Sequence, residues 1–395
     1  MPPGLCPRRI GHPDAFTPDR HPRYLDYLRT QVRELLTGYG RLDILWFDGL
    51  GKTAADYGAV EVNHMARELQ PHLLINNRNG LAEDFDTPEQ RVGKYQDHRA
   101  WESCITICRQ WAWKPNDEMK SLKDCLQTLA LCAGGDGNLL FNVGPMSDGR
   151  IEPRQVGRLK EMGAWLATYG ESIYATRGGP WHPTRIVAST RKGSTVYLHI
   201  FRWEKETLEL PALPRAVKSA ASLGGGRATV RQQNGKLTVS VDPAARDAID
   251  TIVKIELAGS AVDIPAIALV PPIKATASNV YHPNMADHGP QQAFDHDPST
   301  RWATDAGTKQ AWIARDLEKP VTVGRVRINE AIGERVRRFE VGYREGDGWQ
   351  TIFAGEKIGR AFTKVFPPVT AREFRLNILE ATDGPTIAEI EFLEK

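Results

Sequence analysis

Three polar residues lie where strand-like segments end. Asp48 follows the apolar run Leu42–Phe47, Arg78 lies in the string NNRNG, and Glu89 lies in DFDTPEQ. Such an apolar run is typical of a parallel strand covered on both faces, and barrel enzymes place catalytic groups at the C-terminal ends of these strands. We therefore expect the three side chains to meet at one rim of a sheet.

Two carboxyl groups in one pocket match the needs of glycoside hydrolysis, in which one carboxylate attacks and one acid protonates the leaving oxygen. Their environments must differ, and Arg78 and Trp46 could supply part of that difference. Apolar faces for a sugar ring are expected from three further tryptophans, Trp101, Trp111 and Trp113. Spacing alone leaves other interpretations open: Asp48 as a helix cap or salt-bridge partner, and Glu89 as a solvated loop residue.

Alternating helical and strand-like segments must position these residues. The periodicity predicts helices over Tyr24–Tyr39, 54–69, 118–132 and Pro153–Tyr169, and strands over 42–47, His72–Ile75, Ser103–Cys108 and the segment GNLLFNVGP. Because a closed (β/α)8 barrel takes roughly 200 residues or more, we expect a partial TIM-like barrel that lacks its N-terminal half.

The pattern changes after Gly178 to short alternating strands, such as Ser194–Phe201 and Thr251–Leu257, which indicate an antiparallel β-sandwich. A Pro- and Ala-rich connector follows, and then a compact all-β block. The expected fold is thus multidomain α/β plus all-β. Its predicted parts are the barrel segment (1–179), the sandwich (180–260), a linker (261–273) and a C-terminal module (274–395).

The strings YGRLDILWFDG, NNRNG, DFDTPEQ, WESCITICRQWAW and GGDGNLLFNVGPMSDGRI resemble the catalytic domain of family 29 glycoside hydrolases, the α-L-fucosidases. The resemblance covers about residues 12–180. It implies exo-hydrolysis of α-L-fucosyl linkages in fucosylated glycans by a retaining double displacement, without a cofactor for catalysis. Asp48 matches the nucleophile and Glu89 the general acid/base of one subgroup, with Glu102 as the alternative.

The same resemblance implies substrate-binding roles for four further residues. Arg78 corresponds to a residue close to the catalytic carboxylates, and Trp46 to an aromatic that lines the pocket. Trp111 corresponds to an aromatic near the apolar face and methyl group of the sugar. For Trp113, sugar contact and core packing are both open.

One departure from this family concerns histidines. Its members carry a consecutive His-His pair in the N-terminal half-barrel, and this chain contains no such pair. The first residues, MPPGLCPRRI, have no family character and are interpreted as a misplaced or frame-shifted start of a longer gene. We therefore expect poor activity of this chain, with a non-catalytic carbohydrate-binding fragment as the alternative.

The strings AFDHDPSTRWAT, AWIARDL and PTIAEIEFLE resemble the discoidin-like modules, also called F5/8 type C or family 32 carbohydrate-binding domains. These are jelly-roll β-sandwiches that often hold one structural Ca²⁺, which prefers several oxygen ligands. By position in the motif, the implied ligands are Asp295, Asp297, Thr300, Ala388 and Glu389. A plain turn with solvated aspartates is the alternative, and Trp302 and Trp312 are expected in the core.

Composition limits the remaining classes. The 395 residues carry a formal net charge of +2, so nothing favours a nucleic acid partner and a neutral substrate fits better. We expect five buried free cysteines, no membrane span and no signal peptide. The full-length form is expected to be periplasmic or secreted. The sequence does not determine an oligomeric state.

Overall fold

The computed structural model describes residues 17–18, 20–48, 53–269, 273–282, 285–297 and 300–394. Contacts divide the chain into two compact units, residues 1–269 and 270–395. Each unit has its own hydrophobic core. Among the described residues, no helix is long and apolar enough to cross a membrane. The two units are described separately below.

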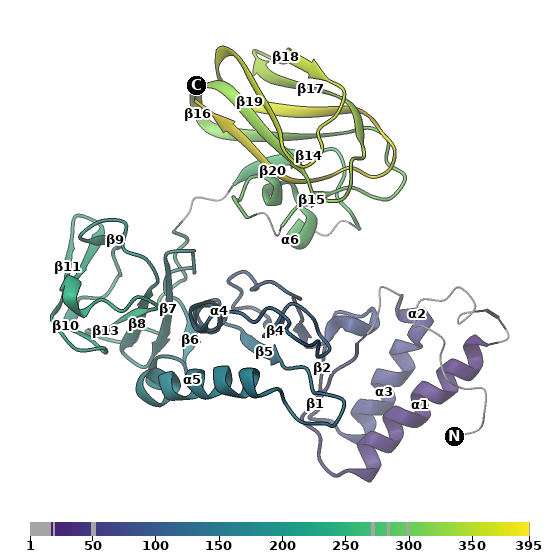
Figure 1. Ribbon diagram of the computed structural model, residues 1–395, viewed down its shortest axis with the longest axis vertical. Coiled ribbons are helices and arrows are strands. Elements are labelled where there is room, and N and C mark those ends of the chain that lie inside the picture. Colours follow the sequence, from purple (N-terminus) through teal and green to yellow (C-terminus); the bar gives the residue numbers. More distant parts are fainter. Residues whose placement is uncertain are drawn as a thin grey trace. The chain divides into compact units, whose positions relative to one another are not determined.

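The first unit begins with alternating helices and parallel strands (Figure 1). In chain order these are α1 (His21–Gly38), β1 (Ile44–Leu45), α2 (Ala54–Tyr57), α3 (Ala59–Leu69), β2 (Leu74–Ile75), β3 (Phe85–Asp86), β4 (Ala100–Thr106), α4 (Leu122–Gly134), β5 (Asn138–Asn142) and α5 (Pro153–Tyr169). The predicted alternation is confirmed in this part of the chain. The strand after α1 is shorter than predicted, and β3 was not predicted.

Local sequence explains several of these boundaries. The expected helix over 54–69 is two helices, because Gly58 adopts a left-handed conformation (φ 55°) between α2 and α3. Helix α4 begins at a capping box in which Ser121 and Asp124 bond each other's backbone N–H groups. Pro153 occupies the first turn of α5, where its missing N–H costs no helical bond.

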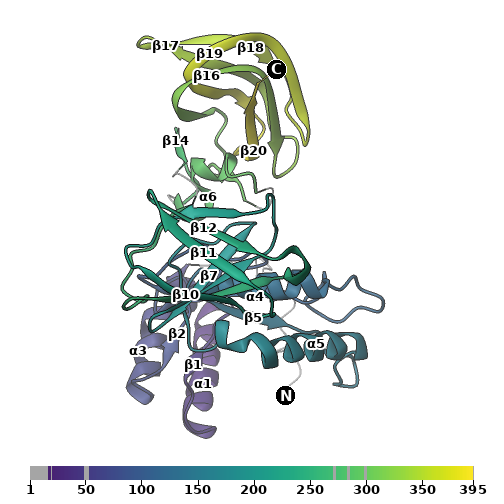
Figure 2. The same ribbon diagram turned by 90° about the vertical axis from the view of Figure 1, so that its left-hand side faces the viewer.

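Five parallel strands form an open arc. β1 pairs with β2, and β3 with β4 and β4 with β5, while a bridge between Asn76 and Phe85 links the two sets. Helices α1 and α3 lie side by side and bury one face of β1 and β2 (Figures 1 and 2). The other face is open, since Ile44, Leu74 and Leu140 are 40–48% exposed. The carboxyl ends of the five parallel strands thus lie along one edge of the arc, as expected from the sequence.

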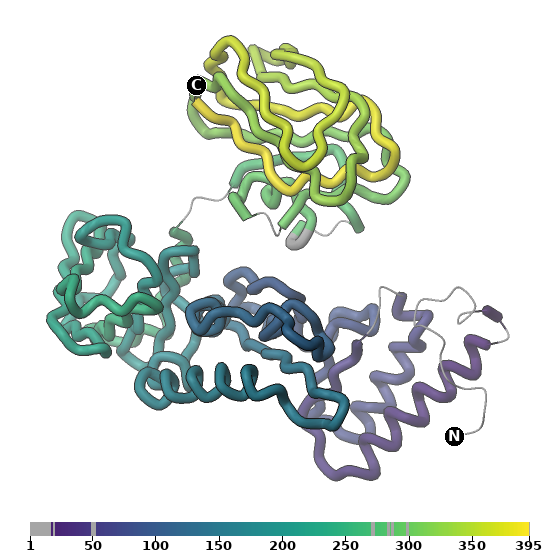
Figure 3. The backbone as a smooth tube through the Cα atoms, in the orientation of Figure 1, coloured from purple at the N-terminus to yellow at the C-terminus, as the bar shows by residue number. Residues whose placement is uncertain are grey.

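The chain runs from α5 directly into a lobe of antiparallel strands (Figure 3). These strands are β6 (Arg177–Gly178), β7 (Val187–Lys192), β8 (Thr195–Ile200), β9 (Leu208–Pro211), β10 (Val217–Ser222), β11 (Ala228–Gln233), β12 (Lys236–Val241) and β13 (Thr251–Leu257). They form one sheet of five strands and one of three, which enclose an apolar core around Trp181 and Leu237. The β-rich character predicted after Gly178 is confirmed.

The second unit is a seven-stranded antiparallel assembly. Its elements are β14 (Lys274–Ala277), α6 (Met285–His288), β15 (Trp302–Ala303), β16 (Ala311–Glu330), β17 (Val336–Glu345), β18 (Gly348–Gly355), β19 (Phe362–Ala381) and β20 (Thr386–Leu393). Trp302 is fully buried, as expected. Trp312 is only half-buried and lies against Arg375, so the core assignment for Trp312 was wrong.

Candidate active site

Arg78 joins the two predicted catalytic carboxylates. Its Nη1 lies 3.2 Å from Asp48 Oδ1 and 2.6 Å from Glu89 Oε2. Because both distances share one nitrogen, the two oxygens are no further apart than the sum of 3.2 and 2.6 Å, which is 5.8 Å. The side chain of Arg78 is 14% exposed, whereas Asp48 and Glu89 are 73% and 43% exposed. Two accessible carboxylates therefore flank one largely buried cation.

Asn76 fixes the strand end that carries Asp48. Its side chain accepts a hydrogen bond from Phe47 N and donates one to Phe47 O, both at 2.8 Å. Asn76 is fully buried at the end of β2, which pairs in parallel with β1. A buried amide that satisfies both backbone groups of Phe47 leaves the next residue, Asp48, with little freedom in direction.

Thr87 holds Arg78 from the other side. Arg78 Nε donates to Thr87 Oγ1 at 2.8 Å, and Thr87 Oγ1 donates to Asn77 Oδ1 at 2.9 Å. Two residues later, Glu89 forms a parallel bridge with Cys104 of β4. Strand β4 and the loop from β3 therefore place Glu89 next to Arg78.

Trp46 and Glu102 extend the site. The guanidinium of Arg78 lies over the Trp46 ring, 4.7 Å from its centroid. Trp46 Nε1 donates to Glu102 Oε1 at 3.2 Å. Burial raises the pKa of Glu102, and the hydrogen bond from Trp46 opposes that shift. Glu102 is thus a third carboxyl group at the site, in the environment that an acid needs.

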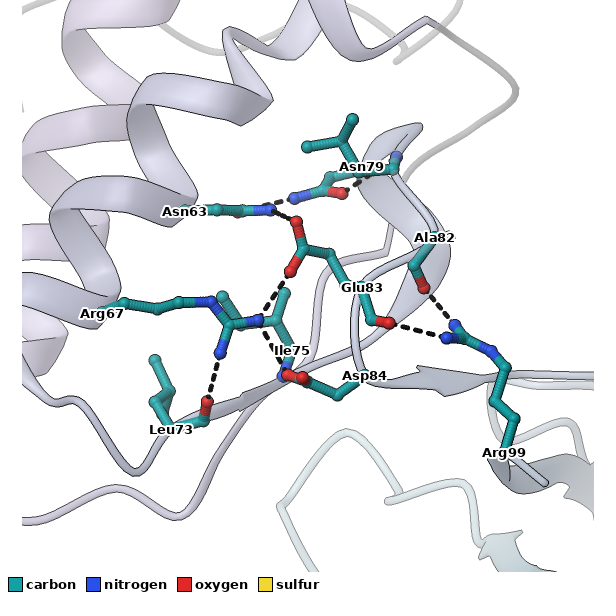
Figure 4. Close-up of polar contacts among 10 residues, drawn as sticks. Asn63, Arg67, Leu73, Ile75, Asn79, Ala82, Glu83, Asp84 and Arg99 are labelled. Atoms are coloured by element: carbon teal, nitrogen blue, oxygen red, sulfur yellow. Dashed lines mark hydrogen bonds and ion pairs between the residues drawn. The ribbon is translucent and has the colours of Figure 1, made fainter. Parts of the chain in front are cut away.

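A polar network behind the site fixes the loop after β2 (Figure 4). Arg67 of α3 donates to Glu83 at 2.6 Å, to Asp84 at 2.9 Å and to the carbonyl of Leu73 at 3.1 Å. Because these partners lie on both sides of the NNRNG segment, Arg67 ties that segment to the helix that supports it.

Two asparagines and a second arginine complete the network. Asn63 Nδ2 donates to Glu83 Oε1 at 2.7 Å, and Asn79 Nδ2 donates to Asn63 Oδ1 at 2.8 Å. Arg99, which directly precedes β4, donates to the carbonyl of Glu83 at 2.7 Å and to that of Ala82 (Figure 4). The loop that carries Arg78 is held at several points. This polar network was not predicted from the sequence, although the polar residues around NNRNG could have indicated it.

The sequence suggested that Trp101 offers an apolar face to a sugar, but the structure buries this side chain. It is 3% exposed, and its Nε1 donates to Gly135 O at 3.2 Å. A Cβ added at Gly93 or Gly137 would lie only 2.6 or 2.2 Å from the ring. Glycines thus leave a narrow space in the core that the Trp101 ring fills. The predicted surface position of Trp101 was wrong, because packing against glycines leaves no periodic pattern in the sequence.

Trp111 and Trp113 follow the C-terminal end of β4, the end of the parallel strands at which Asp48 and Glu89 lie. Trp111 is 39% exposed, and Trp113 is half-buried. Asn142, at the end of β5, donates to Trp111 O at 2.9 Å, which orders this loop. The loop after β4 thus carries both residues, and their sugar-binding roles stay predictions.

The described cysteines of the first unit are buried. Cys104, Cys108, Cys125 and Cys132 are free and buried, as expected, and Cys6 lies outside the described residues. Burial raises the pKa of Cys125 to about 11. These thiols therefore stay protonated at neutral pH and act as small apolar groups.

A second polar site lies in the C-terminal unit. Glu389 of β20 is 8% exposed, and neither of its carboxylate oxygens has a hydrogen-bond partner. Burial raises the pKa of Glu389 to about 8, and repulsion from Asp295, Glu391 and Asp297 adds to the shift. The hydroxyl of Thr300 lies 2.9 Å from Asp295 Oδ1 and 3.0 Å from the carbonyl of Asp297. Three of the other predicted calcium ligands, Asp295, Asp297 and Thr300, thus lie near the buried carboxylate of Glu389, which His296 Nδ1 approaches at 4.0 Å.

Comparison with known proteins places both units. Residues 10–171 match the alpha-L-fucosidase family, and residues 274–392 match the F5/8 type C domain. The first of these segments is therefore similar to the alpha-L-fucosidases. The F5/8 type C match agrees with the all-β architecture of the second unit.

The match to each individual relative covers only part of that relative's length. The chain is 33% identical over 220 residues to tissue alpha-L-fucosidase of Macaca fascicularis, which covers 48% of this chain and 44% of that protein. Alpha-L-fucosidase isoenzyme 1 from Paenibacillus thiaminolyticus matches in structure with a TM-score of 0.53 and 33% identity, over 60% of this chain and 62% of that chain. An alpha-L-fucosidase GH29 from Bacteroides thetaiotaomicron shares the fold at 23% identity, with a TM-score of 0.55 and 61% of each chain covered. The chain therefore spans less than half the length of the curated relatives it matches.

Proposed function

We propose that the first unit acts in the hydrolysis of α-L-fucosyl linkages in fucosylated glycans, by a retaining double displacement with Asp48 as the nucleophile. The observation that carries this proposal is the sharing of Arg78 by Asp48 and Glu89. Carboxyl groups of retaining glycosidases lie roughly 5–5.5 Å apart, whereas inverting enzymes need about 6.5–9.5 Å. The limit of 5.8 Å between the two oxygens fits the retaining geometry.

In this mechanism Asp48 attacks the anomeric carbon, and a carboxylic acid protonates the leaving oxygen. Arg78 stabilises the Asp48 carboxylate before attack and compensates the negative charge that returns to it when water releases the sugar. The open side chain of Asp48 can approach a substrate, while the buried cation remains fixed by Thr87. Trp46 supplies an apolar wall under the guanidinium.

Two residues compete for the acid/base role. Glu89 matches the family motif and lies next to Asp48 through Arg78, whereas Glu102 has the raised pKa that favours a proton donor. We propose Glu89, with Glu102 as the alternative. Glu89→Ala should spare aryl fucosides with good leaving groups and impair those with poor ones. If instead only Glu102→Gln shows this dependence on the leaving group, the role moves to Glu102.

Trapping of the covalent intermediate tests the nucleophile. A 2-fluoro-fucosyl fluoride should add one fluorofucosyl group to the peptide that contains Asp48, as measured by mass spectrometry. Asp48→Gly should abolish labelling and turnover of an aryl α-L-fucoside, and azide should partly restore turnover. The absence of both labelling and turnover in the unmodified chain would contradict the proposal and favour a carbohydrate-binding fragment without catalysis.

We also propose that the five parallel strands are an arc of a (β/α)8-type barrel. Eight strands close such a barrel, and its interior is filled by side chains of the strands. Ile44, Leu74 and Leu140 are apolar strand residues with open surfaces, which supports their placement on the interior side. In this arrangement the rim with Asp48 and Glu89 is the catalytic end of the barrel.

For the C-terminal unit we propose one structural Ca²⁺. Asp295 and Glu389 would supply carboxylate oxygens, Thr300 a hydroxyl, and Asp297 and Ala388 carbonyl oxygens. The buried oxygens of Glu389 accept no hydrogen bond, and the neighbouring carboxylates Asp295 and Glu391 add negative charge, which fits a cation. Among the described residues, no three His, Cys, Asp or Glu side chains form a ready metal cage, so carbonyl and hydroxyl oxygens must complete the set, which is ordinary for Ca²⁺.

A further inference from the structure

The outer face of the C-terminal unit carries a pocket that belongs to neither site described above. It is an open depression with a cavity volume of about 50 Å³ and is lined by Glu340, Gly342, Trp349, Gln350, Thr351, Arg375 and Asn377. These residues come from β17, β18 and β19, which are neighbours in the sheet (Figure 2). From this pocket we infer a second glycan-binding site, on the sheet face and built around Arg375 and Trp349.

Strand register puts these side chains on one face. Asn377 pairs with both Trp312 and Glu340, and Arg375 pairs with Gly342. Directly paired residues point to the same side of an antiparallel sheet. The alternate residues, such as Phe374 and Leu376, are fully buried in the core. The pocket side chains of β17 and β19 therefore face outward, whereas Gln350 of β18 pairs with Tyr343 and contributes its carbonyl oxygen.

Arg375 lies between two tryptophan rings. Its guanidinium carbon is 4.3 Å from the centroid of Trp312 and 5.3 Å from that of Trp349. Gly342 lies beside Arg375 on β17, so no side chain separates Arg375 from β18. A Cβ at Gly342 would also lie 2.6 Å from the carbonyl oxygen of Gln350. The glycine thus keeps the floor of the pocket open.

The hydrogen-bonding capacity of Arg375 is not used within the described protein. Its Nε is buried and has no hydrogen-bond partner, and burial lowers its pKa. Among the residues that the structure describes, no carboxylate forms an ion pair with Arg375, whereas the nearby Arg344 pairs with Glu373 at 3.5 Å. An arginine whose flat faces are covered by rings offers its N–H groups in plane, toward a bound acceptor.

The mixture of groups favours a neutral sugar ring over an anion. Arg375 only donates hydrogen bonds, Glu340 accepts them when ionised, and Asn377 can do both. Sugar hydroxyls also donate and accept, and Trp349 can contact the apolar face of a pyranose. Glu340 in the same lining would repel a carboxylate or sulfate. The choice of a sugar rests on the proposed action on glycans, whereas the pocket is independent of the fucosidase rim.

Calorimetric titration of the full 395-residue chain tests this site. The probes are the methyl glycosides of L-fucose, D-galactose and D-mannose, with D-glucuronate and inorganic sulfate as anionic alternatives. All titrations use an Asp48→Gly background and added calcium, so that hydrolysis does not contribute heat. We expect saturable binding of at least one neutral glycoside, at least tenfold weaker in Trp349→Ala and in Arg375→Gln.

Arg344→Gln is the matched control, because Arg344 is an exposed arginine of the neighbouring strand β17 that does not line the pocket. It should leave binding unchanged. Trp349→Phe keeps an aromatic face and should bind within threefold of the unmodified chain, which guards against misfolding of the alanine variant. Stronger binding of glucuronate or sulfate, no binding of any neutral glycoside, or equal binding by all variants would overturn the inference. A Trp349→Ala variant that keeps Asp48 is assayed separately for hydrolysis of an aryl fucoside. This assay tests the proposed function independently of the binding site.

Discussion

Glu389 should make the stability of the C-terminal unit depend on pH in an unusual direction. Its carboxyl group has a pKa of about 8 in the folded state, against an ordinary value of 4.5. Between these two values the folded state binds more protons than the unfolded state, so the free energy of unfolding falls as pH rises. The stabilising contribution of the protonated group is complete below pH 4.5 and is lost as pH rises through 8.

The magnitude follows from the same two values. One pH unit of displacement corresponds to about 1.4 kcal/mol, so the full displacement from 4.5 to about 8 gives an upper limit of about 5 kcal/mol. Local relaxation and entry of water reduce the cost of a buried charge. We therefore expect a loss of about 2–3 kcal/mol between pH 5 and 8 without calcium. For a unit of this size the shift corresponds to roughly 10 °C in melting temperature.

Thermal unfolding of the whole chain in the presence of a chelator measures this effect, provided the transition of the C-terminal unit is followed separately. Glu389→Gln should be more stable than the unmodified chain at pH 8 and should lose most of the slope with pH. Glu373→Gln is the control, since Glu373 lies in the same unit, pairs with Arg344 at 3.5 Å and is not among the charges that raise the pKa of Glu389. It should keep the slope.

Calcium should reverse the effect of pH. A cation at Glu389 favours the ionised carboxylate, so added Ca²⁺ should raise the melting temperature most at pH 8 and should have no effect on Glu389→Gln. The reasoning would be refuted by a flat stability profile between pH 5 and 8 in the chelated protein. An unchanged slope in Glu389→Gln would refute it as well.

Three further variants test the support of the candidate active site. Arg67→Met removes hydrogen bonds to Glu83, Asp84 and Leu73, and should lower the unfolding free energy of the first unit by about 2 kcal/mol in urea titration. Hydrolysis of an aryl fucoside should fall as well, and normal turnover with lost stability would separate the network from the site. Gly137→Ala places a Cβ against Trp101 at 2.2 Å and should cost about 3 kcal/mol or leave the chain insoluble, whereas an unchanged melting temperature would contradict the packing described. Ser121→Ala removes the N-cap of α4 and should cost about 1 kcal/mol, with Ser121→Thr as the control that keeps the cap.

Motifs and periodicity were sufficient to predict the main parts of this fold. Helix α5 begins at Pro153 and ends at Tyr169, as predicted, because a proline start and helical spacing are local signals. Strand β13 over Thr251–Leu257 likewise has the predicted bounds. Strand β3 was missed because two residues carry too little pattern, and its pairing with β4 depends on partners far along the chain.

For the candidate site, too, the sequence predicts some features and the tertiary structure decides the others. The sequence by itself determined the residue types that lie at strand ends, Asp48, Arg78 and Glu89, because parallel strands bring their carboxyl ends to one rim. Only the tertiary structure decided that Arg78 lies between the two carboxylates, that Trp101 is enclosed by glycines, and that Trp312 covers Arg375. The physical reason is that strand position follows from local hydrophobic pattern, whereas charge pairing, burial and ring contacts depend on which segments distant in sequence meet.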